Sequence, residues 1–155
     1  MPLSFTDTFG AVVGYGYDLA GNMTAYTETV GMETTRVTRY FDNANRLQAS
    51  FDDDAGTTSY LYDNNGNLTL IIPPNGGAWL HYGYDQRNLM ITHTLSVSGT
   101  SPQLQAAYAY DGAGSRVQQV DYTGAEPETT TYVNDIVGLT QVLLADDGIE
   151  QVYNL

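Results

Sequence analysis

Short segments in which apolar and polar residues alternate recur along the chain, separated by stretches rich in Asp, Asn and Gly. Thr58–Tyr62 is one such segment, and its Tyr60 and Tyr62 stand two positions apart. Alternation of period two with aromatic and β-branched residues predicts a strand whose successive side chains point to opposite faces. Asp63–Asn67 indicates a turn, and Leu68–Ile72 indicates the returning strand. This part of the chain is therefore predicted to form a β-hairpin.

The same hairpin signature occurs six times, each time around one aspartate. The steps between these aspartates are 24, 21, 22, 26 and 24 residues. A period of this length indicates an array of supersecondary units rather than one fold built from unlike elements. The aspartates, which we expect to cap the turns by accepting backbone N–H groups, are Asp18, Asp42, Asp63, Asp85, Asp111 and Asp135. The turn glycines, which supply a positive φ, are Gly21, Gly66, Gly114 and Gly138.

Aromatic residues precede the aspartates at two alternating positions, so we expect them to share one face of the sheet and to form columns across neighbouring hairpins. These residues are Tyr15, Tyr17, Phe41, Tyr60, Tyr62, Tyr82, Tyr84, Tyr108, Tyr110 and Tyr132. The bulk of this face would be apolar, with the tyrosine hydroxyls reaching water. Exposed tyrosine rings could also stack on sugars, which leaves carbohydrate binding open as an alternative.

Two units depart from the template. In the fourth, Tyr84–Leu89 places leucine one residue early, which predicts a tighter or differently typed turn. In the sixth, Asn134 stands where the others carry an aromatic residue, and this unit is the most divergent.

The predicted fold is all-β: about six antiparallel hairpins pair edge to edge into one long, curved or spiralling sheet, because an isolated hairpin is marginal in water. The whole chain, 1–155, would be one array and part of a longer protein. Its units fall roughly at 11–31, 32–56, 57–77, 78–99, 104–127 and 128–148.

Composition agrees with strands and turns and removes several classes of function. The chain of 155 residues carries 16 Gly, 13 Tyr and a net charge of −13, with arginine as its only cation apart from two histidines. Such an acidic chain repels phosphate backbones and anionic membrane surfaces. Cysteine is absent, which excludes disulfides and thiolate metal sites. Neither a signal peptide nor a membrane-spanning apolar run is visible in the segment.

Tyr62-Asp63-Asn64-Asn65-Gly66-Asn67-Leu68 resembles the YD repeat of Rhs proteins, and the resemblance extends over roughly residues 15 to 148. It implies a segment of a hollow β-shell without chemistry in the repeats themselves. In that family, bacterial polymorphic toxins and Tc toxin complexes enclose a toxic domain in the shell, and teneurins carry a similar barrel at the cell surface. The implied partners are further repeats, other copies of the chain or an enclosed cargo, and the implied location is extracellular or at the cell surface.

One feature of the toxin-bearing members is missing from this sequence. Those members end in an aspartyl self-cleavage region with an Asp-Pro motif, and no Asp-Pro dipeptide occurs here. We therefore expect neither the protease nor the toxin domain within this segment.

Other candidate sites are weak. Asp52 and Asp54 could offer oxygen ligands to calcium, but the glycine and glutamate positions of an EF-hand loop do not match, and a solvated turn is the simpler interpretation. His81 and His93 could form a metal pair only if their strands were neighbours in suitable register. Asn22 and Asn67 begin glycosylation sequons that coincide with the turn motif. No pattern indicates a cofactor or a catalytic constellation, so an enzyme is disfavoured.

The sequence therefore leaves a first hypothesis and a rival. The first is a non-enzymatic structural segment of a shell or surface scaffold. The rival is a module that self-associates into a filament or tube through open sheet edges, because unpaired strand edges without lysine are templates for pairing.

Overall fold

The computed structural model describes residues 3–6, 10–97, 100–135, 141–146 and 151–153. Its 14 elements are all strands. They are β1 Leu3–Thr6, β2 Val12–Tyr17, β3 Met23–Val30, β4 Glu33–Phe41, β5 Leu47–Asp52, β6 Gly56–Tyr62, β7 Leu68–Ile72, β8 Trp79–Tyr84, β9 Met90–Ser96, β10 Gln103–Tyr110, β11 Arg116–Asp121, β12 Glu128–Asp135, β13 Gln141–Asp146 and β14 Gln151–Tyr153.

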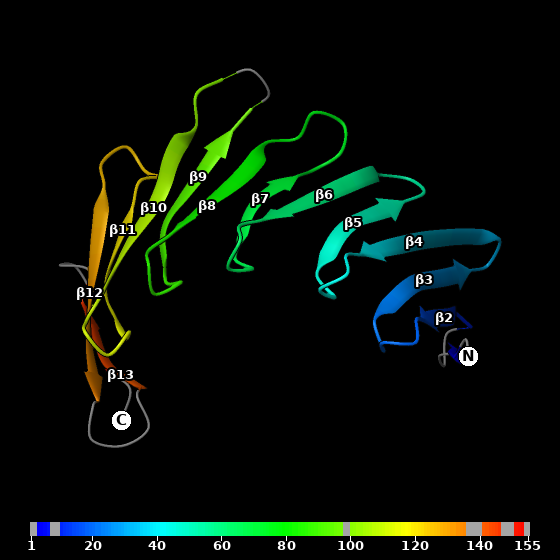
Figure 1. Ribbon diagram of the computed structural model, residues 1–155, viewed down its shortest axis with the longest axis horizontal. Coiled ribbons are helices and arrows are strands. Elements are labelled where there is room, and N and C mark those ends of the chain that lie inside the picture. The colour runs from blue at the N-terminus through cyan, green and yellow to red at the C-terminus, as the bar shows by residue number, and fades with distance from the viewer. Residues whose placement is uncertain (1–2, 7–9, 98–99, 136–140, 147–150, 154–155) are drawn as a thin grey trace. The chain divides into compact units, whose positions relative to one another are not determined.

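The strands are hydrogen-bonded in the order in which they follow one another along the chain, from β1 to β14 in a single sheet (Figure 1). The pairs whose register is described are all antiparallel. The predicted all-β fold of consecutive antiparallel hairpins is therefore confirmed.

The chain divides into two compact units, which are described separately. The first comprises Met1–Tyr62 and Leu70–Trp79, and the second comprises Asp63–Thr69 and Leu80–Leu155. The first unit contains β1 to β6, and the second contains β9 to β14 with most of β8.

A β-bulge on the return strand directly follows the aspartate turn in three hairpins. In β4 and β5, Tyr40 pairs with Ala49 but Phe41 pairs with Leu47, so that Gln48 is the extra residue. The hairpins β2–β3 and β10–β11 have the same shift, with Thr24 and Val117 as the extra residues. A bulge bends the strand and disrupts the ladder locally. The turn end of each hairpin is therefore set by the bulge as well as by the aspartate.

The ladders that join one hairpin to the next end short of the turns. The pairing of β5 with β6 ends at Ala49 and Ser59, although β5 begins at Leu47 and β6 extends to Tyr62. The pairings of β9 with β10 and of β11 with β12 end in the same relation, at Thr92–Ala107 and Gln118–Thr131. Backbone groups at the turn end are thus left without a ladder partner from the next hairpin.

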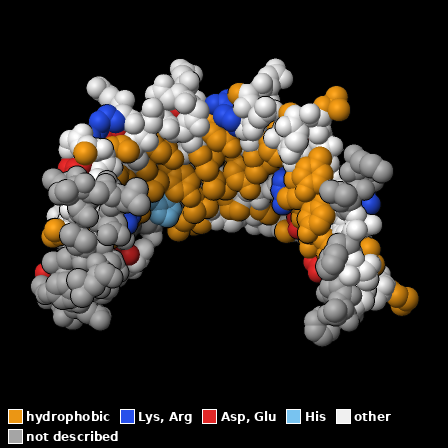
Figure 2. Space-filling view, turned by 90° about the horizontal axis from the view of Figure 1, so that it is seen from below, with side chains coloured by type: hydrophobic (Ala, Val, Ile, Leu, Met, Phe, Trp, Pro, Cys, Tyr) orange, Lys and Arg blue, Asp and Glu red, His pale blue; other side chains and the backbone are white. Residues whose placement is uncertain are grey.

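No second layer covers the described strands. Among the described residues the buried apolar side chains are Ala11 and Ala106, each 7% exposed, and no large side chain is fully buried. Hydrophobic side chains nevertheless gather on one face of the strands (Figure 2). No helix that could span a membrane is found in the part of the chain that the structure describes.

Candidate functional site

The aspartate turns are built alike in the five repeats whose turns are described. In the third repeat, Asp63 Oδ1 accepts the N–H groups of Asn65 and Asn67 at 2.9 and 2.8 Å. The Asp63 N–H donates to the Asn67 carbonyl, and the Gly66 N–H donates to the Asp63 carbonyl. Equivalent bonds surround Asp18, Asp42, Asp85 and Asp111. Asp135 ends β12, and its side chain and Gly138 lie outside the described residues.

The expectation of a tighter turn in the fourth repeat is wrong. The Asp85 N–H donates to the Leu89 carbonyl at 2.9 Å, which is the same closure that Asp63 makes with Asn67. Asn88 takes the place of the glycine with φ 62°, as Asn45 does in the second repeat with φ 59°. Asparagine tolerates this left-handed conformation better than other residues with a side chain. Asn88 therefore aligns with Gly66, and Leu89 aligns with Asn67 rather than with Leu68.

Hydrogen bonds to the carboxylates favour their charged form. The side chain of Asn22 holds the pKa of Asp18 below its usual value, and that of Asn67 does the same for Asp63. The backbone N–H of Leu89 lowers the pKa of Asp85. These carboxylates are therefore ionised hydrogen-bond acceptors within the turns rather than proton donors.

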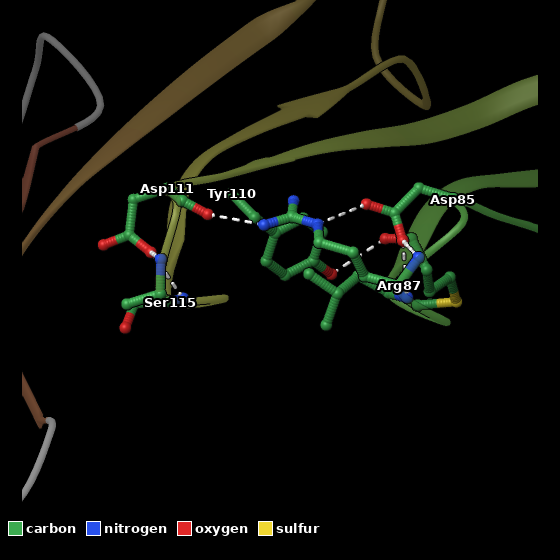
Figure 3. A network of polar contacts seen from close by, with 8 residues as sticks. Asp85, Arg87, Tyr110, Asp111 and Ser115 are labelled. Carbon is green, nitrogen blue, oxygen red and sulfur yellow. Dashed lines mark hydrogen bonds and ion pairs between the residues drawn. The ribbon is translucent and has the colours of Figure 1, made fainter.

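Side chains also link the first turn to the second, the third to the fourth and the fourth to the fifth, and we call this set of contacts the turn row. Asn22 Nδ2 donates to Asn45 Oδ1 at 3.1 Å, and Asn67 Nδ2 donates to Asn88 Oδ1 at 2.8 Å. Figure 3 shows the corresponding link in which Arg87 spans from the Asp85 carboxylate to the Asp111 carbonyl.

The turn row bears on the two glycosylation sequons. Asn22 Nδ2 donates both to Asp18 Oδ2 and to Asn45, and Asn67 Nδ2 donates both to Asp63 Oδ2 and to Asn88. An amide nitrogen carries two hydrogens, and both are used at each asparagine. A glycan on either nitrogen would remove at least one of these bonds.

Side chains at the position before the aspartate donate hydrogen bonds to the preceding hairpin, in the region beyond the last backbone pair of the ladder. The Tyr62 hydroxyl donates to the Leu47 carbonyl and the Tyr110 hydroxyl to the Met90 carbonyl, each at 2.8 Å. In the sixth repeat, Asn134 Nδ2 donates to the Arg116 carbonyl at 3.0 Å. We call these three contacts inter-hairpin latches.

The latches correct one expectation and refine another. The hydroxyls of Tyr62 and Tyr110 were expected to reach water, but they bond to the backbone of the preceding hairpin. Asn134 lacks the aromatic ring but keeps the donor, because its carboxamide reaches the equivalent carbonyl. The carbonyls of Leu47, Met90 and Arg116 each lie five residues after a turn aspartate. The sequence pattern predicted the packing of the aromatic rings but not the hydrogen bonds that these side chains donate to the preceding hairpin.

The tyrosine rings contact different kinds of ring on the neighbouring strand. The ring centres of Tyr15 and Tyr26 are 5.7 Å apart, and those of the stacked Tyr82 and His93 rings are 5.2 Å apart. Equivalent tyrosines occupy every second strand, and strands are spaced about 4.8 Å apart, so a residue of the return strand lies between them.

Arginines fill some of these intervening places. The guanidinium of Arg46 lies 4.8 Å from the centre of the Tyr62 ring, and that of Arg116 lies 5.7 Å from the Tyr108 ring and 4.8 Å from the Tyr132 ring. Burial raises the pKa of Tyr62, Tyr84 and Tyr110, which keeps their hydroxyls protonated.

The remaining candidates do not converge. Asp52 Oδ1 accepts the N–H groups of Asp54 and Ala55 at 2.9 and 2.8 Å, so it serves the β5–β6 turn. His81 contacts Ser96 at 2.9 Å, whereas His93 stacks on Tyr82, which as the neighbour of His81 points to the other face. Within the described ranges, no three His, Asp or Glu side chains are arranged to hold a metal ion.

Comparison with known proteins gives a likeness of fold alone. No protein-family model matches the chain, and no curated protein matches it by sequence. The crystal structure of TcdB2-TccC3-Cdc42 is similar with a TM-score of 0.70 and 17% identity, over 97% of this chain. The chain spans 8% of the length of that protein chain. The Photorhabdus luminescens Tc holotoxin pore matches with a TM-score of 0.39 and 12% identity, over 91% of this chain and 11% of its own.

Proposed function

We propose that this chain is a non-enzymatic segment of an Rhs/YD-repeat shell, which encloses a cargo or forms part of an extracellular or cell-surface assembly. The observation that carries the proposal is how the repeated side chains are used. The turn aspartates accept bonds within their own turns, while Tyr62, Tyr110 and Asn134 bond to the preceding hairpin. The repeated side chains are thus used to build the turns and to join a hairpin to the one before it.

The open sheet supports the same proposal. Its strands carry apolar side chains on one face, yet no layer in the described residues packs on that face (Figure 2). An apolar face of this kind is stabilised when further repeats or an enclosed polypeptide pack against it. The likeness of fold to the crystal structure of TcdB2-TccC3-Cdc42, which extends over 97% of this chain, also supports the proposal.

The test is electron microscopy of the full-length protein from its natural source, with this chain located by fitting its hairpins. We expect these repeats to form part of a wall around an internal volume. A compact fold without a lumen, or a wall built from unrelated elements, would contradict the proposal.

The rival proposal is self-association through sheet edges. Strand β1 bonds to β2 on one side, and the sequence contains no lysine to discourage pairing at the other. Size-exclusion chromatography with light scattering separates the two ideas. A stable monomer of the 155-residue chain removes the filament, whereas polymers with a fixed helical rise would favour it over the shell.

A further inference from the structure

A hollow of about 290 Å³ lies on β2, β3 and β4 within the first unit. Its lining includes Gly14, Gly16, Ala25, Thr27, Arg36 and Thr38. The register places Gly14 opposite Thr27, Gly16 opposite Ala25, and Thr27 opposite Arg36, so these residues share one face of the three strands. Tyr15 lies between the two glycines in sequence, so its side chain points to the opposite face of the strand, where its ring contacts Tyr26.

The floor of the hollow carries no side chain larger than a methyl group, and the side chains of Thr27 and Ala25 already stand against Gly14 and Gly16. A Cβ atom added to Gly14 would come within 2.6 Å of Thr27 Oγ1, and one added to Gly16 would come within 3.2 Å of the Ala25 Cβ. Neither glycine has a positive φ, so backbone conformation does not require glycine at these positions. The two glycines and Ala25 together leave a flat patch of backbone and methyl group at the base of the hollow.

The walls supply one cation and two hydroxyls. Arg36 is exposed on β4, and in the part of the chain that the structure describes it forms no ion pair, unlike Arg46 and Arg87. Thr27 and Thr38 flank it with hydroxyl groups that can both donate and accept hydrogen bonds. A guanidinium binds a carboxylate with two parallel hydrogen bonds. The walls are therefore suited to a ligand that combines a carboxylate with hydroxyl groups.

Exposed aromatic residues adjoin the hollow on the same face. Phe51 lies directly opposite Thr38 and is 40% exposed, and Tyr40, two residues beyond Thr38, is 56% exposed. Aromatic rings at a wet surface provide an apolar platform for the C–H face of a sugar ring. The aromatic surface thus extends beyond the hollow in the direction that a second sugar unit would occupy.

The geometry points to a binding site for an acidic sugar, with the carboxylate on Arg36, ring hydroxyls on Thr27 and Thr38, and the ring over Gly14, Gly16 and Ala25. Tyr15 also lines the hollow, but its ring contacts Tyr26 on the other face, and the site is independent of the proposed shell function. Asp53, the residue after β5, donates its backbone N–H to the Arg36 carbonyl, so its carboxylate is close enough to compete for the guanidinium. We therefore expect weak monovalent binding, with Kd of about 1–10 mM.

The test is NMR titration of the isotope-labelled 155-residue chain with sodium glucuronate, glucose and sodium acetate. We expect saturable shifts of the Gly14, Gly16 and Thr27 amides with glucuronate, and at least about fivefold weaker effects with glucose or acetate. Added salt should weaken glucuronate binding, because the ion pair is exposed.

Variants decide whether the hollow is responsible. Ala25→Leu fills the floor and Arg36→Gln removes the charge, so each should abolish saturation while the amide spectrum stays folded. Thr35→Ala, on the opposite face of β4, is the matched control and should bind like the parent chain. Equal shifts with acetate or with glucose, no saturable shift with glucuronate, or unchanged binding by folded Arg36→Gln would each overturn the assignment.

Discussion

The Tyr110 hydroxyl donates a hydrogen bond of 2.8 Å to the carbonyl oxygen of Met90, on the strand that ends the preceding hairpin (Figure 3). The ladder between these strands stops at Ala107 and Thr92, three residues before Tyr110 and two residues after Met90. The hydroxyl therefore reaches a carbonyl that lies beyond the last backbone pair. Tyr62 and Leu47 stand in the same relation to their ladder.

Replacing Tyr110 by Phe tests whether this latch contributes to stability. The variant keeps the ring but leaves the Met90 carbonyl without its donor, so we expect the free energy of unfolding to fall by about 1 kcal/mol in urea. Tyr84→Phe is the matched control, because Tyr84 has the same repeat position and no hydroxyl partner is found for it among the described residues. Equal losses in the two variants would mean that the latch has no role of its own.

The sixth repeat provides a second test through Asn134, whose amide makes the latch in place of a tyrosine. Asn134→Ala removes the donor, and we expect a loss of about 1 kcal/mol. Asn134→Tyr restores the residue found in four other repeats and should keep the parent stability or exceed it. Hydrogen exchange of the β11 and β12 amides is the measurement, since local opening there reports on this junction. Protection unchanged in Asn134→Ala would count against the latch.

These latches mark the limit of what could be predicted from the sequence. Alternation and the Asp-Asn-Gly turn located the third hairpin well: the expected strands Thr58–Tyr62 and Leu68–Ile72 correspond to β6 and β7. Local rules suffice there because both strands and the turn depend on neighbouring residues. The latch depends instead on a bulge in one hairpin and on where the ladder to the next hairpin ends, and neither has a strong local signal.

The prediction for the fourth turn was wrong for a different reason. Matching Leu89 to the leucine of the template hides Asn88 as the residue with the positive φ. Aligning Asn88 with Gly66 would have placed Met90 at the leucine position and predicted the ordinary turn. The hollow on β2 to β4 was missed because it depends on which residues three strands bring together, although the Gly14-Tyr15-Gly16 sequence hints at a bare face.

The left-handed residue of the fourth turn can be tested directly. Asn88→Ala retains a Cβ but lacks the side-chain groups that help asparagine adopt a positive φ, so we expect a loss of about 1 kcal/mol. Asn88→Gly relieves the backbone and loses only the contact with Asn67, so it should be less harmful than alanine. Thermal unfolding of the two variants is the measurement. If alanine proves as stable as glycine, the assigned turn conformation is wrong.

The pH dependence of stability follows from carboxylates and tyrosines whose pKa values move in opposite directions. The pKa of Asp63 lies below the ordinary value of 3.8, mainly because the Asn67 side chain bonds to it, and Asp18, Asp42 and Asp85 are also lowered. A lowered folded pKa gives stability that is present above the unfolded value and is lost as pH falls through the folded one. These turns should therefore weaken in acid, below about pH 4.

Burial raises the pKa of Tyr62, Tyr84 and Tyr110 above 10.0. Their contribution is present below the unfolded value and is lost as pH rises through the folded values, so stability should also fall in alkali, above about pH 10. Melting temperatures recorded across the pH range should thus show a plateau with a decline at both ends.

A pair of variants separates the acid decline from the change in overall charge. Lowering the pH also relieves self-repulsion in a chain of net charge −13, and this effect opposes the loss of the turns. Asp63→Asn removes one lowered carboxyl and should flatten the acid side of the profile, with a lower melting temperature at neutral pH. Asp54→Asn removes the same charge at an exposed position and should leave the acid slope as it is. If both variants change the slope equally, net charge rather than turn capping governs the acid response.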